Sequence, residues 1–228
     1  INFIDNNSKF DTANIQFIIG PYDDYALARA VELKQELNGE ITVLNVGPVE
    51  SEPSIRKALA IGADKAVRIN AEPTDSFFVA EQIYNHAKDE NYDLILMGRE
   101  SIDFNSGVVH AMVAEMLGIP SVSPVMRLDI NGTTASMDRE IEGGKQLIEV
   151  EFPFVAGCQE PIAEWKIPAV RGIMQARSKP LIVVEPSGEE SSKVVNFEFP
   201  AEKAACKMVE ADNVSELVNL LKNEAKIL

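Results

Sequence analysis

Two hydrophobic periodicities alternate along the first half of the chain. The apolar runs Ile15–Ile19 and Ile41–Val46 are each followed by a Gly-Pro turn, which predicts two buried strands. Between them, apolar residues recur at helical spacing until Asn38-Gly39, where the helix is expected to end. The same alternation predicts helices at Ser54–Ile61, Phe77–Ala87 and Val108–Leu117 and strands at Lys65–Ile69 and Tyr92–Met97. This order predicts an α/β fold: a doubly wound, mostly parallel sheet with helices on both faces, in three αβα layers.

The pattern changes at Val122. Alternating residues on both sides of Asn131-Gly132 predict a β-hairpin, because Asn-Gly favours a tight hairpin turn. A second turn at Glu142–Gly144 leads into the alternating stretch Leu147–Phe152. We therefore expect an antiparallel insertion at about 122–152.

The last third of the chain predicts a strand, a loop, an arm and a helix. The strand Val155–Cys158 precedes a proline-punctuated loop at about 159–177, and Leu181–Val184 resumes as a strand. The tail that follows is rich in Ser, Glu and Lys and has little helical pattern. Apolar residues then recur at helical spacing from Val214 to Leu228, with Asp212 or Asn213 as the N-cap. The expected organisation is an α/β domain at 1–184 and a C-terminal arm with an amphipathic helix at 185–228.

The composition and the absent motifs exclude several classes of function. The formal charge of −15 argues against nucleic-acid binding, because such binding requires neutralisation of phosphates. No apolar run approaches the roughly 20 residues of a membrane-spanning helix, so no direct membrane insertion is expected. The sequence has no phosphate-binding loop, no dinucleotide fingerprint and no zinc-ligand spacing, and its two cysteines make no disulfide framework. The residues by themselves therefore indicate an acidic α/β protein that is not an enzyme on its own.

Four groups of residues, in this order along the chain, carry a resemblance to a known family. They are Gly20–Leu27 (GPYDDYAL), Val46–Pro48 with Arg56–Asp64, Gly98–Asp103 (GRESID), and Arg139–Gly144 (REIEGG) with Arg171–Ala176 (RGIMQA). Each is weakly specific alone, but together they extend over nearly the whole chain. In these four groups of residues taken together, the chain resembles the β subunit of electron-transfer flavoproteins.

The resemblance implies a non-catalytic subunit of a heterodimer. An α subunit would hold most of the FAD, and the segment 185–228 would wrap that subunit. The pair would take electrons from acyl-CoA dehydrogenases or other flavin dehydrogenases and deliver them to a quinone oxidoreductase. The expected location is the bacterial cytoplasm, with the mitochondrial matrix as the alternative.

Members of the family begin with a strand that precedes the position of Ile1. A parallel sheet without this strand lacks a central member and has unpaired edges. We expect the native protein to have the strand.

Glu140 is the candidate residue on the flavin side of the subunit interface. It occupies the position of a family glutamate that pairs with an α-subunit arginine. A carboxylate in this place would hold the guanidinium, whose charge favours a reduced flavin. The alternative is an exposed strand glutamate on an acidic surface.

Val170, Trp165 and Ile167 are the candidate partner-binding residues. Val170 occupies the place of the family's leucine anchor, which inserts into the dehydrogenase, and an exposed aliphatic side chain suits such an apolar pocket. The loop carries extra residues relative to the family pattern, so Trp165 could serve as the anchor instead. The alternative is that Trp165 and Val170 pack beneath the loop.

Ser101 and Asp103 are the candidate nucleotide-binding residues, because the resemblance matches them to the family's nucleotide-binding loop. Many relatives bind AMP, or a second FAD, through a loop in which Gln, Thr or Val, and Gly occupy the positions of Val108, Val109 and His110. Valines provide little for phosphate binding, which uses hydroxyls, amides and close backbone approach. These departures weaken the case for AMP.

Two other functions remain open at this point. A stand-alone nucleotide-binding protein similar to universal stress proteins predicts ATP binding by the isolated chain. A structural subunit with degenerate sites predicts dimerisation without electron transfer.

Overall fold

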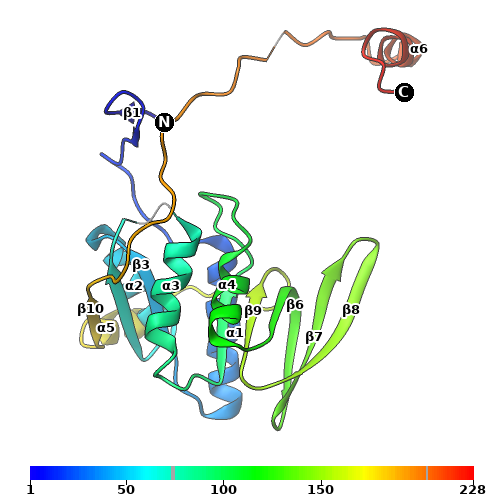
Figure 1. Cartoon of the computed structure of the whole chain (residues 1–228). Coiled ribbons are helices and arrows are strands. Elements are labelled where there is room, and N and C mark those ends of the chain that lie inside the picture. Colours follow the sequence, from blue (N-terminus) through cyan, green and yellow to red (C-terminus); the bar gives the residue numbers. More distant parts are fainter. Residues whose placement is uncertain (73–74, 204) are drawn as a thin grey trace. The chain divides into compact units, whose positions relative to one another are not determined.

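The computed structural model describes residues 1–72, 75–203 and 205–228 (Figure 1). The described residues divide into two units, one of Thr12–Val195 and one of Ile1–Asp11 with Asn196–Leu228. The candidate residues all lie in the first unit.

The unit Thr12–Val195 contains two sheets. In the first, the order is β10-β4-β3 and all pairs are parallel; in the second, the order is β5-β9-β6-β7-β8, parallel from β5 to β6 and antiparallel from β6 to β8. The strands of the first sheet are β3 Thr42–Gly47, β4 Lys65–Asn70 and β10 Leu181–Val184. Those of the second are β5 Leu94–Gly98, β6 Ser121–Asn131, β7 Thr134–Ile141, β8 Gly144–Glu151 and β9 Phe154–Cys158. The predicted α/β fold with an antiparallel insertion is confirmed.

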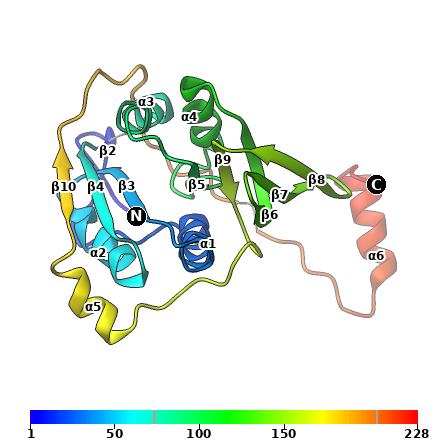
Figure 2. The same cartoon turned by 90° about the horizontal axis from the view of Figure 1, so that it is seen from below.

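Helices cover both faces of the parallel strands. Figure 2 shows α1 and α2 on one side and α3 and α4 on the other. These helices are α1 Pro21–Leu37, α2 Glu52–Ile61, α3 Ser76–Ala87 and α4 Val109–Leu117, with a short 3₁₀ turn, η1 Val49–Ser51, before α2. Helix α1 begins at a proline, whose fixed φ suits the first turn, and ends at Asn38 in the left-handed conformation.

The parallel strands do not form one continuous sheet. Within the described residues, β3 pairs only with β4, and β5 pairs only with β9. The facing edges of β3 and β5 therefore lack a strand partner, which is the arrangement that the sequence predicts for a sheet without its first strand. That the native protein has this strand stays a prediction.

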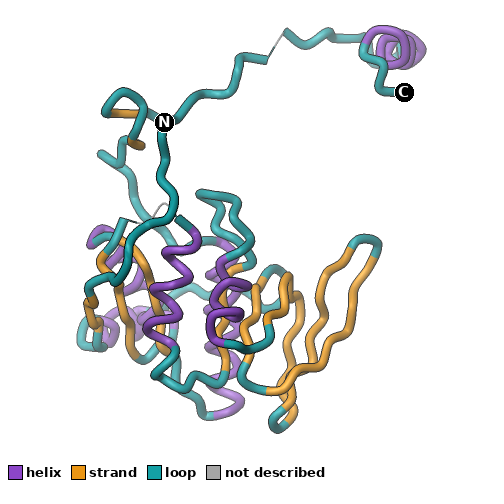
Figure 3. Tube along the Cα trace, in the orientation of Figure 1, coloured by secondary structure: helices purple, strands orange, loops and turns teal. Residues whose placement is uncertain are grey.

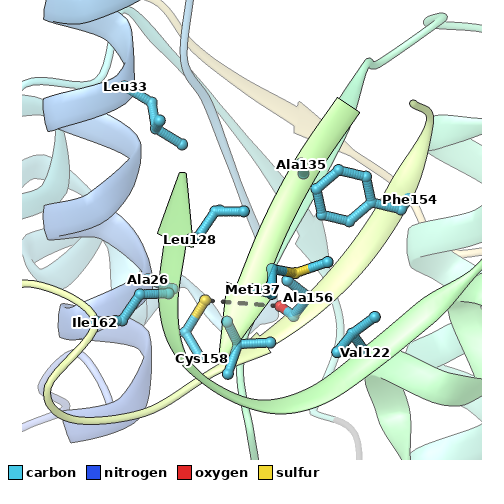
Figure 4. Close-up of a cluster of buried hydrophobic side chains, with 11 residues drawn as sticks. Ala26, Leu33, Val122, Leu128, Ala135, Met137, Phe154, Ala156, Cys158 and Ile162 are labelled. Carbon is cyan, nitrogen blue, oxygen red and sulfur yellow. Dashed lines mark hydrogen bonds between the residues drawn. The ribbon is translucent and has the colours of Figure 1, made fainter. Parts of the chain in front are cut away.

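The largest core cluster packs α1 against β6, β7 and β9 (Figure 4). All five residues of β9 are buried, and the Phe154 side chain is fully enclosed. Burial of one such side chain stabilises the fold by roughly 1.5–3 kcal/mol. From α1, the guanidinium of Arg29 donates two hydrogen bonds to the Leu128 carbonyl on β6, at 3.1 and 2.8 Å. Apolar packing and this polar contact together fix α1 on the second sheet.

The prediction of a strand at Ile15–Ile19 is wrong. These residues form no strand, and the side chains of Ile15 and Ile18 are 42% and 72% exposed. None of the described strands pairs with this segment, although β3 and β5 each have an unpaired edge, so the apolar run alone does not make a strand. Ile19 packs instead against the cluster of Leu27, Val31 and Ala58.

The last third of the chain contains a helix that the pattern did not predict. Within the predicted loop 159–177, α5 Val170–Ala176 forms one and a half to two turns on α2. Between β10 and α6 Val214–Asn219, the described residues contain neither helix nor strand, as expected for an arm (Figure 3). Asn213 caps α6, since its side-chain oxygen accepts a hydrogen bond from the Glu216 N–H. The helix then widens into η2 Leu220–Glu224, which has π-helical geometry.

The second unit joins the two ends of the chain. Its short hairpin pairs β1 Phe3–Ile4 with β2 Lys9–Phe10. The ring of Phe3 stacks on Phe197, with centroids 5.1 Å apart, and the Phe197 N–H donates to the Asn7 carbonyl at 2.7 Å. The aromatic contact and the hydrogen bond hold the N-terminal hairpin to the part of the arm that contains Phe197.

The part of the arm that follows β10, which we call the proximal arm, is fixed to the N-terminus of α3 through Ser191 and Ser192. One carboxylate oxygen of Asp75 accepts from the Phe77 N–H at 2.9 Å and so caps the helix. The other accepts from the Ser191 N–H, the Ser191 hydroxyl and the Ser192 N–H, at 2.7, 2.6 and 2.9 Å. These hydrogen bonds, that of the Ser191 hydroxyl above all, lower the pKa of Asp75 to about 2.

We expect Asp75→Ala to release the proximal arm and to lower the free energy of unfolding by about 1–3 kcal/mol, because a cap and several charge-assisted hydrogen bonds are lost. Since folding lowers the Asp75 pKa, the contribution is complete above the usual value of 3.8 and falls as the pH decreases toward about 2. Urea unfolding at neutral pH measures the loss of stability, and cleavage of the arm by a glutamate-specific protease measures its release.

The matched control is Asp89→Ala, which removes an exposed carboxylate beyond the other end of α3. Equal cleavage of the two variants would contradict the anchoring role.

Candidate functional site

Glu140 lies exposed near the end of β7. One oxygen of its carboxylate accepts a hydrogen bond from the side-chain amide of Gln159, the first residue after β9. The amide oxygen of Gln159 in turn accepts from Nη1 of Arg99 at 2.8 Å. The second sheet therefore brings three polar side chains together from β7, β9 and the loop after β5.

Arg99 follows β5, and several groups hold it in place. Its backbone N–H donates to the Cys158 carbonyl at 3.0 Å, Nη2 pairs with Glu100 at 3.1 Å, and the guanidinium lies 4.6 Å from the centre of the Tyr22 ring. Partial burial acts to lower the pKa of Arg99, but the Glu100 carboxylate and Tyr22 outweigh it, and the pKa lies above its ordinary value. Arg99 is therefore a fixed positive charge.

A pocket of about 350 Å³ opens beside this cluster. It is lined by Arg99, Glu100, Gly107, His110, Ser123 and Pro124. His110 of α4 is buried, which lowers its pKa, so the imidazole is neutral at neutral pH. The buried Nε of Arg99 has no hydrogen-bond partner among the described residues. The pocket is therefore lined by the Arg99–Glu100 ion pair and by a neutral imidazole.

The residues predicted for a nucleotide pocket lie in the exposed loop between β5 and α4. Ser101 and Asp103 are both exposed, and Ser101 pairs across the loop with Ser106 in an isolated β-bridge. The Ser106 hydroxyl contacts that of Ser76 at the start of α3, at 2.7 Å. Neither Ser101 nor Asp103 lines the pocket described above. Their role in nucleotide binding stays a prediction.

The predicted partner-binding residues form part of an exposed apolar surface. We call it the docking surface; it consists of Trp165, Ile167, Val170, Ile173 and Met174, which are 47–76% exposed. Val170 lies three and four positions before the last two members of this set, so they share one face of α5. Val170 and Trp165 therefore do not pack beneath the loop. That these residues bind a partner stays a prediction.

Close backbone packing fixes α5 on α2. A Cβ atom at Gly172 would lie 2.3 Å from the Ala60 carbonyl oxygen, so only glycine allows this approach. From α2, Arg56 donates to the carbonyls of Ala176 and Lys179 at 2.9 and 2.7 Å. Lys179 donates back to the Leu59 carbonyl at 2.8 Å. These contacts set the direction in which the docking surface faces.

The described residues contain no group of three or more His, Cys, Asp or Glu that could hold a metal ion. None of the helices in the described part of the chain has the length and apolar character needed to cross a bilayer.

Residues 8–188 match the family of the electron transfer flavoprotein domain. The chain belongs to the electron transfer flavoprotein family. Within that family it is 36% identical over 235 residues to electron transfer flavoprotein subunit beta of Bacillus subtilis, an alignment that covers 96% of this chain and 91% of the relative. The corresponding subunit of Syntrophomonas wolfei is 34% identical over 227 residues, which cover 97% and 90% of the two chains.

A relative with another name is also similar. The acryloyl-CoA reductase electron transfer subunit gamma of Anaerotignum propionicum is 32% identical over 189 residues, which cover 80% of this chain and 71% of that subunit. These relatives confirm the resemblance to electron-transfer flavoprotein β subunits and a role in electron transfer.

The sequence reasoning assigned no role to Gln159 or Gly172, and it quoted Arg99 only as part of a motif. A signal for Gln159 and Arg99 was present, since each directly follows an apolar strand and the carboxyl ends of parallel strands lie at one edge of a sheet. Gly172 gave no such signal, because its role depends on the distance between two helices.

We expect Gly172→Ala to lower the free energy of unfolding by about 1–3 kcal/mol, because the methyl group would force α5 away from α2. Urea unfolding measures the loss. Gly144→Ala is the control, since a Cβ atom there meets no atom within 4 Å. An equal loss in both variants would show that α5 has no close contact to protect.

Proposed function

We propose that the chain is the β subunit of a heterodimeric electron-transfer flavoprotein, an electron carrier and not a catalyst by itself. Its α partner holds most of the FAD. The pair accepts electrons from acyl-CoA dehydrogenases or other flavin dehydrogenases, as in fatty acid oxidation, and passes them to a quinone oxidoreductase. We place it in the bacterial cytoplasm, with the mitochondrial matrix as the alternative; the relatives include bacterial proteins and two named mitochondrial.

The observation that carries the proposal is the exposed, oriented carboxylate of Glu140. Gln159 holds one of its oxygens, and no lysine or arginine of the described residues forms an ion pair with it. The nearby cations are engaged elsewhere, because Arg99 pairs with Glu100 and Lys145 pairs with Asp138. Glu140 can therefore receive a cation from another chain, and an arginine of an α subunit fits in charge and in hydrogen-bond geometry.

The residues present fit a shared flavin better than an enclosed one. The pocket of about 350 Å³ lies near the lower end of the roughly 300–1,000 Å³ range of small-molecule sites, and FAD is larger than most ligands in that range. The chain therefore offers one polar wall, with Arg99, His110 and Ser123, and an α subunit must supply the rest of the site. When bound, FAD takes up and releases the electrons. Glu140 would hold the α-subunit cation in place beside it.

The docking surface supports an electron donor as partner. Contiguous exposed apolar side chains on a fixed helix are typical of a protein-protein contact. Because α2 already holds α5 rigidly, little conformational entropy is lost when a partner binds. Val170, 76% exposed, is the candidate anchor, and Trp165 and Ile167 are also exposed, in the loop before α5.

Co-purification with the α-type protein encoded beside this chain, followed by identification of the released nucleotides, tests the proposal. We expect one FAD per heterodimer. FAD with AMP would show that the loop of Ser101 and Asp103 still binds a nucleotide, and two FAD would indicate two flavin sites. A complex that contains no flavin would contradict the proposal and favour a structural subunit. ATP bound by the isolated chain, with no α complex, would favour a nucleotide-binding protein similar to universal stress proteins.

We expect Val170→Asp to slow flavin reduction by an acyl-CoA dehydrogenase about tenfold or more, because a charge replaces an apolar anchor. Stopped-flow reduction of the heterodimer measures the rate, and the flavin spectrum should stay unchanged. Val49→Asp is the control, since it places the same charge at a half-exposed valine of η1. Equal rates for the wild type and Val170→Asp would remove Val170 as anchor.

A further inference from the structure

The side-chain amide of Gln159 connects two opposite charges. Gln159 is only 6% exposed and directly follows β9, where its backbone N–H donates to the Val125 carbonyl at 3.0 Å. Its amide oxygen faces Arg99, and its amide nitrogen faces Glu140. Each end of the amide therefore meets the group that it can bind.

The two charges determine the orientation of this amide. In the reversed orientation, the amide oxygen would face the Glu140 carboxylate and the NH₂ group would face the Arg99 guanidinium. Oxygen would then meet acceptors only, and the NH₂ group donors only, so both hydrogen bonds would be lost. The observed orientation also aligns the amide dipole with the field between the cation and the anion.

Of the three hydrogen-bonded side chains Arg99, Gln159 and Glu140, Arg99 is the one held most firmly. Its backbone is hydrogen-bonded to Cys158, its Nη2 to Glu100, and its guanidinium lies over the Tyr22 ring. Glu140 is the free end, because it is exposed on β7. Without Gln159, the Glu140 side chain would have its full rotamer freedom, which costs free energy whenever a partner must bind it in one position.

We infer that Gln159 and Arg99 are positioning residues, which hold the Glu140 carboxylate in one orientation for a cation of the partner subunit. This inference rests on the proposed function and adds to it the residues that make Glu140 effective. Arg99 acts through Gln159, and Gln159 acts through Glu140. Neither needs to touch the flavin for this role.

The first test is a double-mutant cycle of Gln159→Met and Glu140→Ala in the isolated chain. Gln159→Met keeps the length of the side chain and removes both of its hydrogen bonds. We expect a coupling of about tenfold in the unfolding equilibrium constant, as for a hydrogen bond to a charged group. Additive effects of the two substitutions would overturn the inference, whether or not the proposed function holds.

The second test measures the flavin midpoint potential of the heterodimer. We expect Gln159→Met to shift the potential in the same direction as Glu140→Gln but by less, and to cause no further shift when Glu140→Gln is already present. A purely structural role predicts additive shifts, and such a result would overturn the inference. A complex without flavin would contradict the proposed function and this positioning role together.

Two further variants keep the result interpretable if Gln159→Met folds poorly. Arg99→Lys keeps the charge but loses the planar arrangement of donors, so it should shift the flavin midpoint potential by less than Glu140→Gln does. It should cause no further shift when Glu140→Gln is already present. Tyr25→Phe is the matched control, because it removes another hydrogen bond at the same edge, from the Tyr25 hydroxyl to Glu160 at 3.1 Å. It should leave the potential unchanged. A shift with Tyr25→Phe as large as that with Arg99→Lys would overturn the inference.

Discussion

Strand β9 lies between β5 and β6, and parallel backbone pairing to both holds its five buried residues in register. Pairing of Gly98 with Cys158 places the residues that follow, Arg99 and Gln159, side by side. Because β6 continues into the antiparallel pair with β7, the same register brings Glu140 to the other end of the Gln159 amide. The candidate site is thus a direct consequence of strand pairing, and the core of α1 against β6, β7 and β9 stabilises it.

The docking surface depends on a different set of contacts. Helix α5 is too short to be stable alone, and its position follows from the close approach of Gly172 to α2 and from hydrogen bonds of Arg56 and Lys179. Figure 2 shows α5 beside α2, and the hairpin of β7 and β8 at the opposite side of the same unit. The surface proposed for the electron donor lies on α5 and the loop before it, whereas the carboxylate proposed for the α subunit lies on β7, so different elements carry the two proposed contacts.

Much of the fold could be predicted from local patterns. The helices α1 to α4 and the strands from β3 to β9 lie within a few residues of their predicted positions, because most of them have a clear periodicity and a Gly, Asn or Pro at a boundary. The prediction failed where an element depends on a neighbour. Residues 15–19 have the apolar run of a strand but pair with none of the described strands, whereas α5 has no strong helical pattern but a neighbour to pack on.

For the site, the sequence by itself determined the chemistry that each position can offer. It supplied a carboxylate at Glu140, apolar residues in a proline-punctuated loop, a net negative charge, and motifs sufficient to indicate the family. Only the tertiary structure decided that Glu140 is held by Gln159 and Arg99, and that Val170 lies on a helix that Gly172 fixes to α2. The physical reason is that these contacts join residues 19 to 112 positions apart in the chain, so that strand register and helix-helix distance set them, and no local pattern in the sequence encodes either.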